Sequence, residues 1–204
     1  MIVTSPFLIL KKIPYRESAL LLQGLSPDYG RLSFVLHGGQ SLKKSAPEAD
    51  IFREVEVEFE DDLSGRDMFT AKHLETITDF SALANNNRNY RMAVKIADFL
   101  LANSSGEVLI HTYEVTKAVF ANLAGFECGH ELWDLTRCAV VLKAAFLCEN
   151  GMLPEAVTQA QNEFLENLIA SGVDNCHLPE AEAQYWNSLN EWLNQLITYH
   201  KLKK

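Results

Sequence analysis

The chain has 204 residues, of which 48% are hydrophobic and 22% are charged, and its net charge is −9. This composition is typical of a folded globular protein and excludes a mainly disordered chain. No apolar run approaches the roughly 20 residues that a transmembrane helix needs, which argues against a membrane-spanning protein.

The charge is unevenly distributed along the chain. Residues 1–46 carry six Lys and Arg against two Asp and Glu, a net charge of +4. Residues 47–80 carry a net charge of −8, and residues 81–204 a net charge of −5. The distribution therefore indicates one basic segment at the start of an otherwise acidic chain, and a partner with negative charge would contact that segment.

Residues 1–80 are predicted to form five β-strands. In the clearest of them, Val55, Val57 and Phe59 alternate with glutamates at 54, 56, 58 and 60, which is the period of a half-buried strand. The glutamates are expected on a solvated outer face, or else to repel nucleic acid or bind a basic partner. Five antiparallel strands in so short a segment favour a closed barrel. The predicted strands cover Phe7–Leu10, Ala19–Leu22, Arg31–His37, Ile51–Glu60 and Met68–Thr76.

After residue 80 the hydrophobic spacing becomes helical. A polar connector over 81–89 precedes stripes of apolar residues with helical spacing, and Gly125, Gly151 and Gly172 are predicted to end helices. The sequence thus predicts an α+β protein with a five-stranded antiparallel barrel over 1–80 and an all-helical domain over 81–204. The predicted helices centre on Met92–Leu100, Leu109–Leu123, Leu135–Leu147, Phe164–Ile169 and Trp186–His200.

The basic segment is the candidate site for nucleic acid. Its lysines and arginines come from separate strands and turns, and phosphates are bound by such side chains. Two tyrosines, Tyr15 and Tyr29, are candidates to stack on bases, as in barrels that bind single strands. An ordinary charged surface is the alternative interpretation. The candidate DNA-binding residues are Lys11, Lys12, Arg16, Arg31, Lys43 and Lys44.

The sequence contains no motif of a known catalytic centre, neither a phosphate-binding loop nor a nucleophile elbow nor a His-Glu-x-x-His pair. We therefore expect no enzyme, no cofactor and no metal. A zinc site from Cys128, His130, Cys176 and His177 is the alternative, although the paired spacing of zinc ligands is missing. The four cysteines, with no basic leader ahead of Phe7, indicate reduced thiols in a cytoplasmic protein.

The order of motifs over residues 1–60 resembles the bacterial recombination mediator family RecO. The segment Ile9–Leu22 contains Tyr15, Glu17 and Ser18 where the family has a Tyr-Gly-Glu-Ser turn, with Arg16 in place of the glycine. Gly30, Gly38 and Ser45 follow in the order expected of the family. The likeness continues more weakly through Cys138–Pro154 and the basic end of the chain.

This resemblance implies an N-terminal OB-fold, a helical C-terminal domain and a role in DNA repair. RecO-like proteins bind single- and double-stranded DNA, anneal complementary strands, and load the recombinase together with RecR and the tail of single-stranded DNA-binding protein. Carried onto this sequence, the expected DNA contacts are Lys43, Lys44, Arg31 and Arg16.

The sequence departs from the family in two respects. Many members carry a four-cysteine zinc module after the helix that ends in Gly-x-x-Pro, whereas Glu155–Gln161 contains no cysteine. The chain is also shorter and more acidic than is typical. The alternative function is therefore a protein-interaction module on the same fold with weak or lost DNA binding, and an unrelated metal-dependent enzyme is the third possibility.

Overall fold

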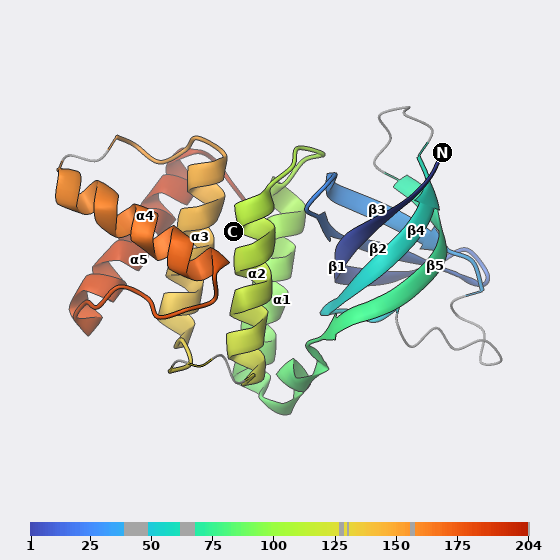
Figure 1. The fold of residues 1–204 in the computed structure, drawn as a ribbon, viewed down its shortest axis with the longest axis horizontal. Helices are drawn as coiled ribbons and strands as arrows, with labels where there is room; N and C mark the ends of the chain where they lie inside the picture. The colour runs from blue at the N-terminus through green and yellow to red at the C-terminus, as the bar shows by residue number, and fades with distance from the viewer. Residues whose placement is uncertain (39–48, 62–67, 127–128, 130, 156–157, 204) are drawn as a thin grey trace. The chain divides into compact units, whose positions relative to one another are not determined.

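The computed structural model describes residues 1–38, 49–61, 68–126, 129, 131–155 and 158–203. The chain forms two compact units (Figure 1). The barrel unit consists of Met1–Ala82 and Val94–Val108, and the helical unit consists of Leu83–Ala93 and Leu109–Lys204. The helix α1 (Asn87–Asn103) contributes to both, since its first half belongs to the helical unit and its second half to the barrel unit.

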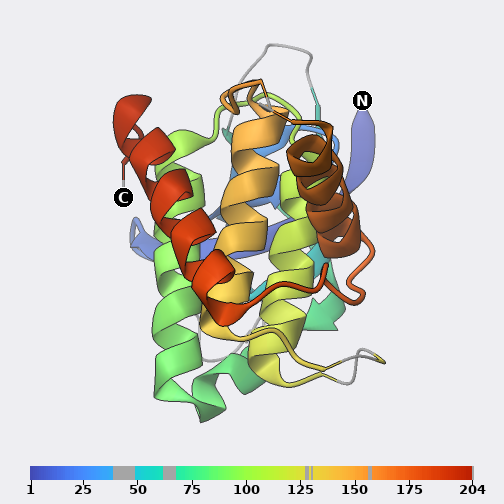
Figure 2. The ribbon, with the colours of Figure 1, turned by 90° about the vertical axis from the view of Figure 1, so that its left-hand side faces the viewer.

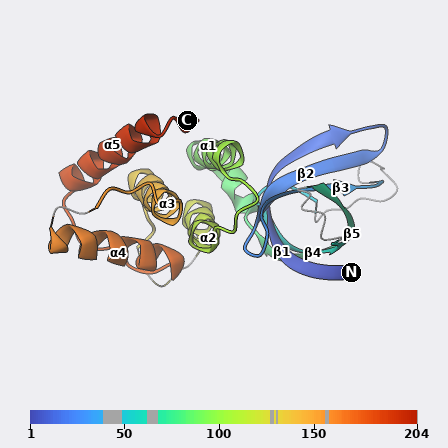
Figure 3. The same ribbon diagram turned by 90° about the horizontal axis from the view of Figure 1, so that it is seen from above.

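The described strands close into a ring, seen from its end in Figure 3. The ring order is β1-β2-β3-β5-β4, which confirms the predicted OB-like barrel. One detail of the prediction is wrong, because β3 pairs with β5 in parallel rather than antiparallel. A closed ring with an odd number of strands cannot alternate direction throughout, so one neighbouring pair must be parallel. The strands are β1 (Ile2–Tyr15), β2 (Ala19–Ser26), β3 (Gly30–Leu36), β4 (Arg53–Glu60) and β5 (Met68–Asp79).

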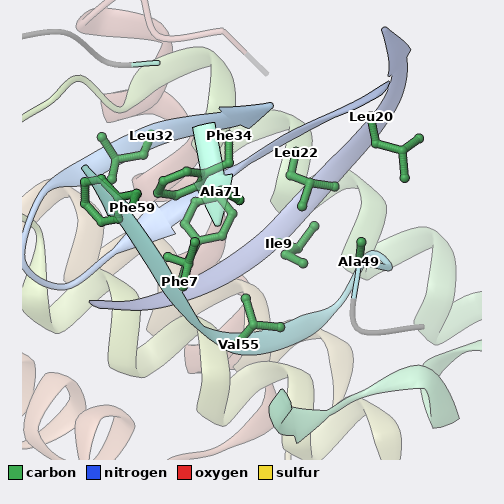
Figure 4. Packing of buried hydrophobic residues seen from close by; sticks show 11 residues of the cluster. Phe7, Ile9, Leu20, Leu22, Leu32, Phe34, Ala49, Val55, Phe59 and Ala71 are labelled. Carbon is green, nitrogen blue, oxygen red and sulfur yellow. The ribbon is translucent and has the colours of Figure 1, made fainter. Parts of the chain in front are cut away.

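The interior of the barrel is an aromatic and aliphatic cluster (Figure 4). The ring of Phe34 lies edge-on to Phe7 with centroids 4.8 Å apart, and its centroid is 5.1 Å from that of Phe59. All three side chains are fully buried. They come from β1, β3 and β4, so the period of two places one apolar face of each strand in a shared core.

The glutamates of β4 follow the prediction with one exception. Glu56 and Glu60 are exposed, as expected of an outer face. Glu54 is buried, and its carboxylate accepts a hydrogen bond of 2.9 Å from the Thr78 hydroxyl of β5. The predicted solvated face is therefore wrong at Glu54, because the outer side of the sheet is covered where β4 begins.

The helical unit is built around α3 (Leu135–Glu149), which packs against α2, α4 and α5 (Figure 2). Both α2 (Ile110–Ala124) and α3 are buried over most of their residues. The remaining elements are a 3-10 turn over Ser81–Asn85, α4 (Gln159–Val173) and α5 (Ala183–Tyr199). No described helix combines the length and the apolar composition needed to cross a membrane.

Local signals account for most helix ends. Gly125 adopts a left-handed conformation (φ 78°) directly after α2, as predicted. The side chains of Asp134 and Thr158 accept hydrogen bonds from backbone amides of the first turns of α3 and α4.

Gly172 was predicted to end the fourth helix, and this prediction is wrong. The helix α4 continues to Val173, with Gly172 inside it. A Cβ atom at this position would lie 2.4 Å from the Cγ1 atom of Val141 in α3. The glycine is therefore needed where α4 approaches α3 closely, and not for a turn.

Side chains at helix ends connect distant parts of the helical unit. The carboxylate of Glu149, the last residue of α3, accepts hydrogen bonds of 2.9 and 2.8 Å from the backbone amides of His111 and Thr112. It thereby caps the first turn of α2, whose own N-cap residue offers no side-chain bond.

The buried side chain of Asn122 makes a second such connection. Its amide donates to the Asn175 side chain at 2.9 Å, and its oxygen accepts from the Trp133 backbone amide at 3.0 Å. The Trp133 indole donates to the Cys176 carbonyl at 3.3 Å. Asn122 and Trp133 therefore hold together the segments that precede α3 and follow α4.

Candidate nucleic-acid interface

The strand β1 changes partner at a bulge, and this bulge directs the candidate basic residues. From Ile2 to Ile9 the strand pairs with β4, and a register shift follows between Ile9 and Lys11. Beyond it, Lys11 to Tyr15 pairs with β2 alone and ends in the turn at residues 16–18. Bulges increase the twist of a strand and re-aim its side chains. Residues 11–23 therefore form a β1–β2 hairpin. Its β1 arm, Lys11 to Tyr15, is the part of β1 that extends past β4.

Lys11 and Lys12 lie on opposite faces of the hairpin. Lys12 is directly opposite Leu22, a residue of the barrel core, so the two share the inner face. Lys11 is opposite Gln23 and shares the outer face with Tyr15. The two neighbouring lysines therefore do not form one surface.

Lys12 is already paired with a carboxylate. Its Nζ atom lies 2.6 Å from Oδ1 of Asp50. Partial burial of Asp50 opposes its ionisation, but hydrogen bonds from Lys12 and the Ile51 amide, with the positive charge of Lys12, outweigh burial and lower its pKa. Much of the charge of Lys12 is therefore compensated within the protein.

Arg16 lies at the tip of the hairpin in a strained conformation. Its φ of 53° is in the left-handed region that favours glycine. Its guanidinium carbon is 5.1 Å from the centre of the Tyr15 ring, a cation–π contact. In the described part of the chain neither Arg16 nor Lys11 forms an ion pair, and both are exposed.

Arg31 has a structural role within the barrel unit. Its guanidinium donates to the Leu101 carbonyl at 2.9 Å, and its backbone amide donates to the Ser105 carbonyl at 2.8 Å. At the neighbouring Gly30 (φ 70°), a Cβ atom would lie 2.1 Å from the Glu107 carbonyl oxygen. These contacts hold the end of α1 and the segment after it against the start of β3.

Tyr29 is packed against the barrel core. Its ring lies edge-on to Phe59 with centroids 5.5 Å apart, and its hydroxyl donates to Asp61 at 3.5 Å. Burial, together with the carboxylates of Asp61 and Asp28, raises the pKa of Tyr29. Of the two candidate stacking residues, Tyr15 is the one on the hairpin beside exposed positive charge.

Several predicted residues cannot be compared with the structure. Lys43 and Lys44, and the zinc candidates Cys128 and His130, lie outside the described residues. Among the described residues, no group of three or more His, Cys, Asp or Glu could hold a metal ion. Burial, with the charge of Asp134, raises the pKa of Cys138 to about 12, so this thiol is a core side chain.

The sequence-based prediction missed the residues that compete for the positive charges. Asp50 and the Leu101 carbonyl are 38 and 70 positions away from their partners Lys12 and Arg31. The acidic excess after residue 46 signalled that pairing was possible, but no local pattern identified the pairs.

The comparison with known families concerns the barrel. No curated protein matches the chain. The family model described as "Recombination protein O N terminal" matches residues 1–80, the segment that contains all five described strands. Both the order of motifs and the closed ring agree with this match. The findings thus identify a RecO N-terminal domain over residues 1–80.

Proposed function

We propose that the chain is a RecO-type recombination and repair mediator that binds single- and double-stranded DNA without enzymatic turnover. A RecO N-terminal domain implies a mediator role, and the match over residues 1–80 is the observation that carries the proposal. The helical unit then serves contacts with other proteins.

The DNA contact that we propose centres on the β1–β2 hairpin. Lys11 and Arg16 are exposed there, and Tyr15 lies beside Arg16 on the same hairpin. Positive side chains next to an aromatic ring match what single strands require, since phosphates bind the charges and bases stack on rings. On sequence grounds Lys43 and Lys44 add two further charges, whereas Lys12 and Arg31 contribute less because other groups already bind them.

The further activities follow from the family. We propose that the protein anneals complementary strands and assists recombinase loading in the cytoplasm, with a RecR-like protein and single-stranded DNA-binding protein as partners. These activities need DNA and protein contacts at the same time, which suits a chain with two compact units.

The test is a salt series of fluorescence anisotropy with a labelled single strand. We expect the double substitution Lys11→Glu, Arg16→Glu to weaken binding and to reduce the salt slope by about 1.4, the value for two lost phosphate contacts. The matched control is Arg88→Glu, Arg91→Glu, which makes the same charge change at exposed positions of α1. Equal losses in both variants would contradict a hairpin site. Lys43→Glu, Lys44→Glu tests the loop in the same way.

A second function is favoured by the compensated charges. Lys12 is paired with Asp50, Arg31 is bound to a backbone carbonyl, and the chain as a whole carries a net charge of −9. A protein-interaction module on the same fold would bind its partner but not DNA. Absence of single-strand binding at low salt, together with retention of a RecR-like partner, would favour this module over the mediator.

A further inference from the structure

Three adjoining hollows lie on the helical unit, one between the segments that precede α3 and α5 and two between α4 and α5. The largest of the three hollows has a volume of about 580 Å³, and Leu132 and Leu178 are among its lining residues. A second, of about 480 Å³, shares Glu180 and Glu182 with the first. A third, of about 330 Å³, shares Gln161 and Tyr185 with the second. Because neighbouring hollows share lining residues, they adjoin one another, and we refer to the three together as one groove.

The second and third hollows are mainly apolar and aromatic, whereas the first is more polar. The rings of Phe164 (α4) and Tyr185 (α5) meet edge-on with centroids 5.1 Å apart, and Trp192 lines the third hollow. Tyr185 and Leu132 are each 42% exposed, so both offer apolar surface to a partner. An exposed apolar strip with polar borders is typical of a protein-interaction surface.

The borders of the groove are strongly acidic. Four glutamates line it. Among the described lining residues, Arg137 is the one arginine, and there is no lysine. Arg137 is itself 3.2 Å from Asp134 and lies over the Trp186 ring. The lining glutamates are Glu131, Glu155, Glu180 and Glu182.

At least three of these carboxylates are not used by the fold. Glu155, Glu180 and Glu182 are exposed and form no ion pair with any other described residue. Glu182 is the N-cap residue of α5, yet its side chain makes no capping bond. Negative charges that stabilise no internal contact are available for a cationic partner.

We propose that this groove binds a basic, apolar peptide segment of a partner protein. Its leucine-like or aromatic side chains fill the hollows beside Tyr185 and Trp192, and its lysines or arginines pair with the glutamates at the border. An acidic segment is disfavoured, because the border would repel it. The proposal concerns the helical unit and does not depend on DNA binding by the barrel.

The experiment measures binding of two labelled peptides of about 12 residues to the whole chain by anisotropy, without DNA. One peptide is an amphipathic leucine–lysine sequence, and the other has glutamate in place of every lysine. We expect saturable binding of the lysine peptide only. The double substitution Glu180→Gln, Glu182→Gln should weaken it about fivefold, and Tyr185→Ser should weaken it about tenfold.

Matched controls separate the groove from the overall negative charge. Glu56→Gln, Glu75→Gln removes the same charge from exposed positions of the barrel, and Tyr199→Ser removes a tyrosine that is 78% exposed on the same helix. Both controls should leave binding unchanged. Equal loss in a control and its groove variant, equal binding of the glutamate peptide, or no saturable binding of the lysine peptide would each overturn the proposal.

Discussion

The strands of the barrel are joined by backbone hydrogen bonds, whereas the helices of the other unit are joined by packing and by side-chain hydrogen bonds, several of them at helix ends. In the barrel, for example, the strand β1 pairs with β4 over Ile2–Ile9 and with β2 over Leu8–Tyr15. In the helical unit, Glu149 caps α2 and Asn122 connects the segments around Trp133 and Asn175. The strands of the barrel are therefore connected mainly through the backbone, and the helices of the other unit mainly through side chains.

This difference affects where each unit can bind a partner. A closed barrel removes its sheet edges and leaves charged side chains at bulges and hairpin tips. Arg16 and Lys11 are at such a position. A helical bundle instead leaves grooves between helices, and the groove along α4 and α5 is one. The two proposed sites thus differ in charge, with Lys11 and Arg16 on the hairpin and glutamates around the groove.

The largest expected effect is in the barrel core. Phe34→Ala removes a fully buried ring that contacts Phe7 and Phe59, and we expect a loss of about 3–5 kcal/mol of stability. Hydrogen exchange in the strands measures this loss. All three tryptophans lie in the helical unit, so tryptophan fluorescence during denaturation reports that unit separately. An equal shift in both measurements would show that the units unfold as one.

The corresponding change in the helical unit is Asn122→Ala. It removes the acceptor of the Trp133 amide and the bond to Asn175, leaving a buried amide without its partner, and we expect a loss of about 1–3 kcal/mol. For this variant, the denaturation transition followed by tryptophan fluorescence should shift more than hydrogen exchange in the strands. The control Asn162→Ala removes an exposed side chain of α4 that donates a hydrogen bond to Glu166, and should change stability by less than about 0.5 kcal/mol. Equal effects would show that the buried connection contributes little.

The smallest expected effect concerns the pairing of Lys12. Asp50→Asn should cost at most about 0.5 kcal/mol, because this pair is partly exposed and screened by solvent. The folded-state pKa of Asp50 is lowered, so the pair stabilises the protein above the ordinary value of 3.8 and this contribution is lost as the pH falls through the folded-state value. Denaturation at pH 7 and near pH 2 should therefore show a difference from wild type only at pH 7.

The same substitution sharpens the proposed DNA site. Release of Lys12 should raise single-strand affinity about twofold at low salt. Glu60→Gln is the matched control, since it breaks the exposed pair between Glu60 of β4 and Lys72 of β5 and makes the same charge change. An equal rise in both variants would attribute the effect to net charge and not to the hairpin.

Much of the fold was accessible from the sequence. The alternation of Val55, Val57 and Phe59 predicted a strand with one buried face, and Gly125 predicted the end of α2. Both signals are local, because a strand face or a helix end depends on residues a few positions apart. The motifs around Tyr15 and Gly30 were sufficient to suggest the family that the match over residues 1–80 shows.

The sequence by itself thus determined the strands, the helices and the family of the barrel. Only the tertiary structure decided that β3 and β5 are parallel, that Gly172 serves a helix contact, and that Lys12 and Arg31 are occupied. The physical reason is that ring closure, close approach and ion pairing join residues far apart in the chain. Periodicity describes which face of an element is apolar, but not which distant group that face meets.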